Sequence, residues 1–183
     1  MDSGWLVGYA QAMPAYAALL RAVNVGGTGK LSMSDLRQLC EDGGLRDVAT
    51  YIQSGNVVFR STRSEASVKK LLEAALAQKL GKPYGVLVRT AGELRALLEE
   101  NPFPDAAPNR VLVLFLDEKP AAASLKNVAT PGGEELRAVG RQLFLHFPNG
   151  MGQSKLKLPF QKTGTGRNLN TVRKLLAMLD ELG

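Results

Sequence analysis

This sequence is poor in the residues that build most metal centres and nucleophilic sites. Its 183 residues include one cysteine, Cys40, and one histidine, His146. A single cysteine excludes an internal disulfide, and one cysteine with one histidine cannot form a Cys/His metal cluster. Aromatic residues make up only 6% of the chain, so few rings are available to stack on nucleic-acid bases. We therefore expect no metal and no cofactor.

Long apolar segments are also lacking. The longest strongly apolar run, VLVLFL at 111–116, has the length of a strand, whereas a membrane-spanning helix needs roughly 20 apolar residues. Residues 1–12 lack the basic and apolar regions of a secretory signal, and Met13 would serve equally well as the start. We interpret 1–12 as an upstream extension or an expression remnant, and we expect a cytoplasmic protein with no membrane partner.

Acidic residues are absent from one segment of a chain that is basic overall. The 23 Lys and Arg residues exceed the 17 Asp and Glu residues, which gives a net charge of +6 and favours an anionic partner. The acid-free segment, residues 150–174, carries six cations: Lys155, Lys157, Lys162, Arg167, Arg173 and Lys174. Its Gly, Thr and Asn residues precede a predicted helix start, where free N–H groups favour an anion.

The predicted last helix, residues 170–182, carries its charges in the unfavourable order. Arg173 and Lys174 lie in the first turn, although cations there oppose the helix dipole by roughly 0.3–1 kcal/mol each. A bound phosphate or other anion would reverse the sign of this contribution. The alternative is a frayed helix start with solvated charges.

Hydrophobic periodicity and turn residues predict the fold of the first half. The expected elements are a strand over 15–25, a helix from Ser32 to Gly43-Gly44, two strands within 47–60, a helix over 65–80 and a strand over 84–90. Ser32 and Asp35, three residues apart, predict an approximate capping box at the start of the first helix. A tight hairpin turn at Ser54-Gly55 joins the two strands within 47–60. The resulting order, βαββαβ, is that of a ferredoxin-like unit in the α+β class.

The second half repeats this order less clearly. A capping box formed by Thr90 and Glu93 opens a helix through Glu100, and the prolines of 101–109 then mark a boundary. Beyond it we expect a strand, RVLVLFL, a short helix within PAAASLKNV, a hairpin that turns at Gly140-Arg141, and the last helix as the second helix of this half. The predicted units are therefore a ferredoxin-like subdomain with a linking helix at 13–100 and a second, related α+β subdomain at 101–183.

No catalytic constellation stands out. His146 lies in the alternating strand LFLHF, which favours a half-exposed or core imidazole. Cys40 lies on the apolar stripe of a helix, as a small buried hydrophobe does. Asp117 and Glu118 are neighbours, and adjacent strand residues point to opposite faces, which argues against a shared metal. Whether the protein is an enzyme stays open.

Three segments together resemble the domain of unknown function 1697 family: LLRAVNVGGTGKLSMSDLRQL, TYIQSGNVVF and GRNLNTVRKL. The similarity spans roughly Met13 to Leu182 and implies an α+β structure with ferredoxin-like parts, but no established activity. The sequence departs from the family pattern at Ala22, where glycine is typical, and at Leu169, where tryptophan is usual. A stacking role for that ring would be lost here, whereas a core role would tolerate leucine.

The resemblance suggests that residues of all three segments surround one polar, ligand-binding surface. The predicted ligand-binding residues are Arg21, Asn24, Gly26, Gly27, Lys30, Gln53, Ser54, Asn56, Arg167, Asn168, Asn170, Thr171 and Arg173. Their amides, hydroxyls and guanidinium groups suit oxyanions better than metals. In the alternative interpretation, Gln53 and Asn56 satisfy turn backbone, Gly55 supplies a positive φ, and Asn168 or Asn170 caps the last helix.

Three functions fit these observations. The first is an oxyanion-binding module for nucleic acid or a nucleotide, although no RRM stacking signature is present. The second is an enzyme acting on a small phosphorylated or carboxylated metabolite, for which no general base is evident. The third is a scaffold that docks a protein partner through an exposed apolar patch. The sequence leaves the ligand and the oligomeric state open.

Overall fold

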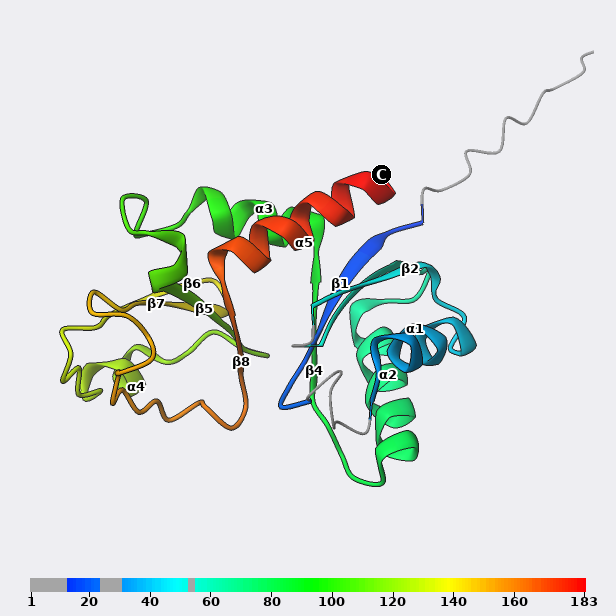
Figure 1. The fold of residues 1–183 in the computed structure, drawn as a ribbon, viewed down its shortest axis with the longest axis horizontal. Helices are drawn as coiled ribbons and strands as arrows, with labels where there is room; N and C mark the ends of the chain where they lie inside the picture. The colour runs from blue at the N-terminus through cyan, green and yellow to red at the C-terminus, as the bar shows by residue number, and fades with distance from the viewer. Residues whose placement is uncertain (1–12, 24–30, 53–54) are drawn as a thin grey trace, which may run out of the picture.

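The computed structural model describes residues 13–23, 31–52 and 55–183, so the predicted extension at 1–12 lies outside the described residues. The described chain forms a mixed α+β structure with two four-stranded antiparallel sheets. Figure 1 shows the sheets side by side, with two helices lying across both of them and the other helices on the outside.

The first sheet contains the strands formed by residues 15–90. These strands are β1 (Ala15–Leu20), β2 (Arg46–Tyr51), β3 (Asn56–Arg60) and β4 (Val86–Thr90), in the spatial order β2-β3-β1-β4. Helix α1 (Met33–Asp42) links β1 to β2, and helix α2 (Glu65–Leu80) links β3 to β4. Both helices lie on the outer face of this sheet (Figure 1) and bury a core that includes Leu36 and Leu72.

Local signals set the ends of α1 and α2. The Ser32 hydroxyl accepts a hydrogen bond from the Asp35 backbone at 3.0 Å, and the Asp35 carboxylate accepts one from the Ser32 backbone at 3.2 Å. This pair confirms the predicted capping box. At the C-terminal end of α2, Gly81 adopts a left-handed conformation with φ 76°, which glycine reaches without steric penalty.

The hairpin between β2 and β3 is wider than the sequence predicted. Tyr51 pairs with Asn56, whereas a two-residue turn at Ser54-Gly55 would pair Gln53 with Asn56. Gln53 and Ser54 themselves lie outside the described residues. Ile52 and Gly55 both have positive φ, 47° and 78°. The tight-turn prediction was wrong because it counted Ile52 as a strand residue, whereas its left-handed backbone ends the pairing.

The second sheet has the same strand order as the first. Its strands are β5 (Val111–Phe115), β6 (Glu135–Val139), β7 (Gln142–His146) and β8 (Thr165–Asn168), ordered β6-β7-β5-β8. A short 3-10 helix, Pro108–Arg110, precedes β5, and α4 (Ala122–Lys126) follows it. The predicted turn at Gly140-Arg141 is confirmed, with Gly140 at φ 57°. In the first sheet, α2 links β3 to β4. The equivalent connection in the second sheet, residues 147–164 between β7 and β8, contains no helix.

Strand β8 was not predicted. The sequence places Gly164 and Gly166 just ahead of the predicted last helix, whereas residues 165–168 pair with β5 as a strand. A Cβ on Gly164 would come within 2.9 Å of the Leu114 side chain, and one on Gly166 within 2.9 Å of Leu112. These glycines therefore serve a close approach of β8 to β5, which the strand propensities of Gly and Asn did not indicate.

Helices α3 (Ala91–Glu99) and α5 (Leu169–Leu182) connect the two halves. They pack against each other across both sheets (Figure 1). The core beneath them includes Leu19 and Val58 of the first sheet, Val113 of the second, and Leu175 of α5. The prediction that the last helix serves only the second half was therefore incomplete, because α5 contacts β1 and β3 as well as β5.

An arginine in the β6–β7 turn also joins the halves. Arg141 lies 2.8 Å from the Glu65 carboxylate and 2.6 Å from that of Glu93. Glu65 is the first residue of α2, and Glu93 lies in the first turn of α3. The hydrogen bond to Glu65 is the main reason that the pKa of Arg141 is raised. The second sheet is thus held to two helix starts of the first half.

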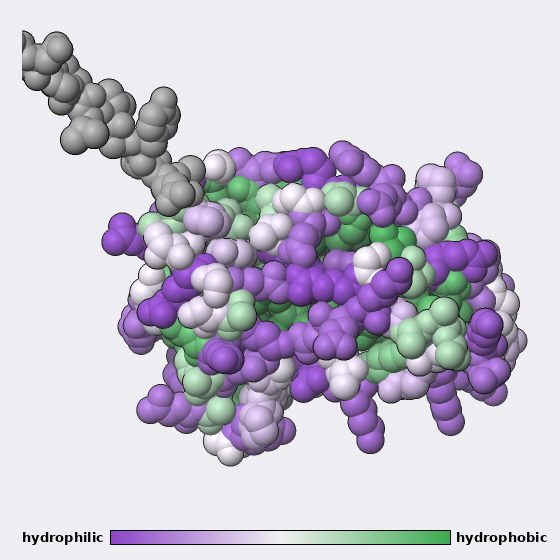
Figure 2. Space-filling model, turned by 180° about the vertical axis from the view of Figure 1, so that it is seen from behind, coloured by the Kyte–Doolittle hydropathy of each residue, from purple (hydrophilic) through white to green (hydrophobic). Residues whose placement is uncertain are grey.

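The surface is mainly hydrophilic. Figure 2 shows polar side chains over most of the rear face, with smaller apolar areas between them. Within the described parts of the chain, no helix combines the length and apolarity needed to cross a membrane.

Candidate functional site

The side chain of Arg167 brings the family motifs together at the ends of three strands. Its Nε donates to Asn56 Oδ1 at 2.6 Å, and its Nη1 donates to Thr165 Oγ1 and to the Gly166 carbonyl, both at 2.8 Å. Its Nη2 donates to the Leu20 carbonyl at the end of β1, at 3.1 Å, and to the Gly55 carbonyl at 3.4 Å. Segments more than one hundred residues apart therefore meet at one guanidinium.

These contacts give Arg167 a structural role, because they hold three strand ends together. It is 6% exposed, and burial lowers its pKa to about 10. An arginine has five N–H donors, and the five contacts above supply each with a protein acceptor. Asn56, itself fully buried, donates to the Tyr51 carbonyl at 3.0 Å and so satisfies turn backbone. The ligand-binding role predicted for Arg167 and Asn56 stays a prediction.

The start of α5 is capped by its own side chains. Asn168 is the N-cap residue, and its Oδ1 accepts a hydrogen bond from the Thr171 backbone at 2.9 Å. Leu169, at the position where tryptophan is usual, is 1% exposed in the core between the sheets, which supports a core role for that position. Asn170 and Arg173 are exposed to solvent.

Arg21 directly follows Leu20, at the exit of β1. Its backbone N–H donates to the Gly85 carbonyl at 2.9 Å, and its guanidinium rests against Gly85, where a Cβ would come within 2.8 Å of it. Among the residues that the structure describes, none forms a hydrogen bond or ion pair with this guanidinium. Within the described chain, the guanidinium donors of Arg21 are therefore available to a ligand, whereas those of Arg167 bond to the protein.

A cavity of about 420 Å³ opens beside Arg21. One wall is the outer face of the second sheet, and the other is the strap, which we define as residues 151–161. The lining comprises Arg21, Ala22, Leu112, Leu114, Leu145, Phe147, Met151, Ser154, Leu156, Leu158, Gln161, Gly164, Thr165 and Gly166. Of these described lining residues, Arg21 alone has an ionisable side chain. We call this space the strap cavity.

The strap takes the place of a second helix on this sheet. Its residues alternate, with Leu156 and Leu158 turned toward the apolar cluster of the sheet and Lys155 and Lys157 exposed. A segment with one side chain every second residue on the inner face covers a sheet less completely than a helix does. The space left between strap and sheet is the cavity.

Several predicted site residues cannot be compared with the structure. Asn24, Gly26, Gly27, Lys30, Gln53 and Ser54 lie outside the described residues. Within the described chain, the structure joins Asn56 to Arg167, places Asn168, Asn170, Thr171 and Arg173 at the start of α5, and places Arg21 at the strap cavity.

Comparison with known proteins identifies the family of this chain. The model of the family described as protein of unknown function, DUF1697, matches residues 13–144. The chain belongs to the DUF1697 family. The structure is also similar to that of the conserved bacterial protein SP0830 from Streptococcus pneumoniae, with a TM-score of 0.75 and 30% sequence identity over 92% of this chain and 99% of that one. No curated protein matches the sequence significantly.

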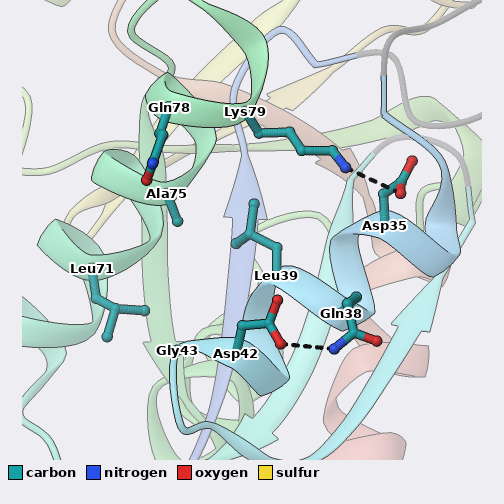
Figure 3. A pocket seen from close by; sticks show the side chains of 9 residues that line it. All are labelled: Asp35, Gln38, Leu39, Asp42, Gly43, Leu71, Ala75, Gln78 and Lys79. Atoms are coloured by element: carbon teal, nitrogen blue, oxygen red, sulfur yellow. Dashed lines mark hydrogen bonds and ion pairs between the residues drawn. The ribbon is translucent and has the colours of Figure 1, made fainter.

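Two further cavities of this DUF1697 protein contain polar side chains that pair with each other. One, of about 470 Å³, lies between α1 and α2 (Figure 3). There Lys79 lies 3.2 Å from Asp35, and Gln38 donates to Asp42 at 2.8 Å. The hydrogen bonds from Ser32 are the main reason that the pKa of Asp35 is lowered.

The other cavity, of about 500 Å³, lies beside the proline-rich segment 102–108. His146 lines it, with Nδ1 3.3 Å from a Glu135 carboxylate oxygen and its ring 5.3 Å from that of Phe103. This partly buried histidine confirms the half-exposed position that its alternating strand predicted. The fully buried Cys40, whose pKa burial raises to about 12, likewise confirms the prediction of a small apolar residue.

Sequence reasoning missed two features of this DUF1697 protein. The strap cavity was one, although the alternation in KLKL at 155–158 carried a period-two signal for an extended covering segment. The other was Arg89, a charged residue in an otherwise apolar strand. Arg89 is 1% exposed, donates to the Leu116 carbonyl at 2.6 Å and lies over the Phe115 ring. Burial, with a smaller contribution from Arg141, lowers its pKa to about 10.

Proposed function

We propose that this protein binds a small organic anion in the strap cavity. One observation carries the proposal: a mainly apolar cavity of about 420 Å³ has Arg21 as its single residue with an ionisable side chain among the described lining residues. Small-molecule sites usually have volumes of about 300–1,000 Å³ and a few polar groups in an apolar lining. A guanidinium binds carboxylates or phosphates through two parallel hydrogen bonds.

The lining favours binding over catalysis. Proton transfer needs a side chain that can gain and lose a proton near neutral pH, such as His, Asp, Glu or Lys. The described residues that line the strap cavity include none of these. An enzyme acting on a small phosphorylated or carboxylated metabolite therefore has less support here than a binding protein.

A thermal-shift screen with a matched pair of arginine variants tests this proposal. The screen uses hexanoate, benzoate and phenyl phosphate as anions, and hexanol and benzyl alcohol as neutral controls. A ligand at 100 times its Kd stabilises a protein by about 2.7 kcal/mol, so at least one anion should raise the Tm of the wild type. Arg21→Gln should abolish the shift. Arg46→Gln, an exposed arginine on β2 outside the cavity, should keep it.

Two results would refute the proposal. One is the absence of any anion-dependent shift in the wild type. The other is an equal shift in the wild type and in Arg21→Gln, which would place the bound anion elsewhere on the protein.

Nucleic-acid binding is the second candidate, supported by exposed cations. Lys155, Lys157, Lys162, Arg173 and Lys174 are all exposed, and no ion pair within the described chain includes them. The sixth cation of the segment, Arg167, is buried. Fluorescence anisotropy with short RNA and DNA should show salt-sensitive binding that Lys155→Gln/Lys157→Gln weakens and Arg46→Gln does not. No binding at low salt would refute this candidate.

A protein-docking scaffold receives less support. Within the described residues, Ile52 is the one large apolar side chain that is exposed, at 44%. A single exposed apolar residue is usual on a monomer and does not mark an interface.

We also propose that the first half of the chain has a ferredoxin-like fold. The element order β1-α1-β2-β3-α2-β4 and the antiparallel order β2-β3-β1-β4 support it. The similar strand order of the second sheet supports a division of the chain near residues 100 and 101. Because such folds host many unrelated activities, this description adds no argument for a particular function.

A further inference from the structure

The polar groups of the strap cavity limit the chemistry of its ligand. This inference rests on the proposed function and concerns the same site. The Thr165 hydroxyl already accepts a hydrogen bond from Arg167, and the Ser154 hydroxyl already donates to Glu134 and accepts from the Leu156 backbone. A ligand rich in hydroxyl groups, such as a sugar phosphate, would leave several of them without partners. Each hydroxyl group left buried without a partner would weaken binding by roughly fivefold or more.

The charge at the cavity matches one carboxylate. Arg21 supplies one positive charge, and the other described lining residues are uncharged. A phosphate monoester carries a charge of about −1.5 to −2 at neutral pH, so one guanidinium would leave part of that charge unbalanced in an apolar setting. A carboxylate carries a single negative charge and matches the planar, two-pronged geometry of the guanidinium.

The walls of the cavity are rows of leucine. Leu112 and Leu114 are two residues apart on β5, so they share one face of the sheet. Leu156 and Leu158 are two residues apart on the strap and pack against the cluster that contains Leu114. Both rows line the cavity. A slot between two rows of branched aliphatic side chains suits a narrow, flexible apolar tail.

We infer that the anion is a monocarboxylate with an alkyl tail, with its carboxylate on Arg21 and its tail between the leucines of β5 and those of the strap. Every methylene buried adds about 0.8 kcal/mol, which is roughly fourfold in affinity. The affinity should therefore rise with tail length until the tail fills the slot, and then level off.

Isothermal titration calorimetry with straight-chain carboxylates tests the inference. Butanoate, hexanoate, octanoate and decanoate, used below their micelle concentrations, should bind with affinity that rises roughly fourfold per methylene and then reaches a plateau. Octanoate should bind at least about tenfold more tightly than octanol, because a hydrogen bond to a charged group is worth about 1.5–3 kcal/mol. Octylamine should not bind.

Two pairs of variants locate the two ends of the ligand. Arg21→Gln should weaken octanoate at least about tenfold and leave octanol unchanged, whereas Arg46→Gln should leave both unchanged. Leu158→Gln should weaken octanoate and octanol alike, whereas Lys157→Gln, on the outer side of the strap, should affect neither. Circular dichroism of each variant verifies that it is folded.

The outcomes separate this inference from the proposed function. If benzoate or phenyl phosphate binds in an Arg21-dependent way without any gain from longer alkyl tails, the inference is refuted and the proposed function stands. If octanoate binds equally well to Arg21→Gln or to Leu158→Gln, the ligand lies elsewhere and the inference is refuted. If no anion binds, both are refuted.

Discussion

Ala22 occupies a backbone conformation that suits glycine. Its φ is 55°, where a Cβ costs roughly 1–2 kcal/mol. This geometry accounts for the glycine that the family resemblance leads one to expect at the position. We expect Ala22→Gly to raise the free energy of unfolding by about 0.5–1 kcal/mol, measured by urea denaturation. Ala177→Gly, exposed within α5, is the control and should lower it by about 1 kcal/mol. A loss of stability in Ala22→Gly would contradict the explanation.

Arg167 is predicted to stabilise the fold through its hydrogen bonds. Lysine keeps the charge but has three donors in place of five, so it cannot satisfy all five acceptors that Arg167 satisfies. We expect Arg167→Lys to lower the free energy of unfolding by about 2–4 kcal/mol in urea denaturation. Arg173→Lys, an exposed position six residues further along the chain, should change it by less than about 0.5 kcal/mol. Equal effects of the two substitutions would refute the structural role of Arg167.

The start of α3 links helix capping to the contact between the halves. Glu93 accepts a hydrogen bond from the Thr90 backbone at 2.9 Å and pairs with Arg141 at 2.6 Å. Burial raises the pKa of Glu93, but these hydrogen bonds outweigh it, so the pKa is lowered from its usual 4.5. A lowered pKa contributes stability that is fully present above pH 4.5 and is lost as the pH falls through the lower, folded-state value.

We therefore expect Glu93→Gln to reduce stability by about 1 kcal/mol at pH 7. The difference from the wild type should shrink as the pH falls below 4.5 and through the lower folded-state pKa, because the wild-type carboxylate then becomes protonated. Urea denaturation at a series of pH values measures this difference. Glu99→Gln, exposed in the same helix, is the control and should change the free energy of unfolding less than Glu93→Gln does. A difference for Glu93→Gln that grows in acid would contradict the assignment.

Elements whose signals are local could be predicted from the sequence. The helix starts at Ser32 and Thr90 depend on residues three positions apart, and both capping boxes form as predicted. Strand β8 could not be predicted, because its Thr-Gly-Arg-Asn sequence has little strand propensity and forms a strand only through pairing with β5. The strap carries a local period-two signal, but the cavity beneath it was missed because the apolar face that the strap covers belongs to a distant segment.

At the scale of the molecule, the sequence predicted that the three motif segments meet, but it did not predict that the residues joining them are buried. The family motifs do meet, since Arg167 contacts both Asn56 and the Leu20 carbonyl. Their amides and cations suggested an open polar surface, yet Arg167 and Asn56 are buried. Burial here results from three strand ends that converge, and composition alone cannot distinguish such a cluster from a ligand site. Arg21 could be distinguished only once the cavity beside it was known.

The shared core between the sheets predicts that the two halves unfold together. Leu175 of α5 is fully buried in the core that also contains Leu19 of the first sheet and Val113 of the second. We expect Leu175→Ala to lower the free energy of unfolding by about 2–5 kcal/mol. In native-state hydrogen exchange, the amides of β1 and β5 should lose protection by the same amount, because their slowest exchange requires the same global opening. Leu182→Ala, near the partly exposed end of the helix, should have a smaller effect on both strands. A loss of protection confined to one strand would mean that each half opens independently, and α5 would then stabilise only the sheet whose protection fell.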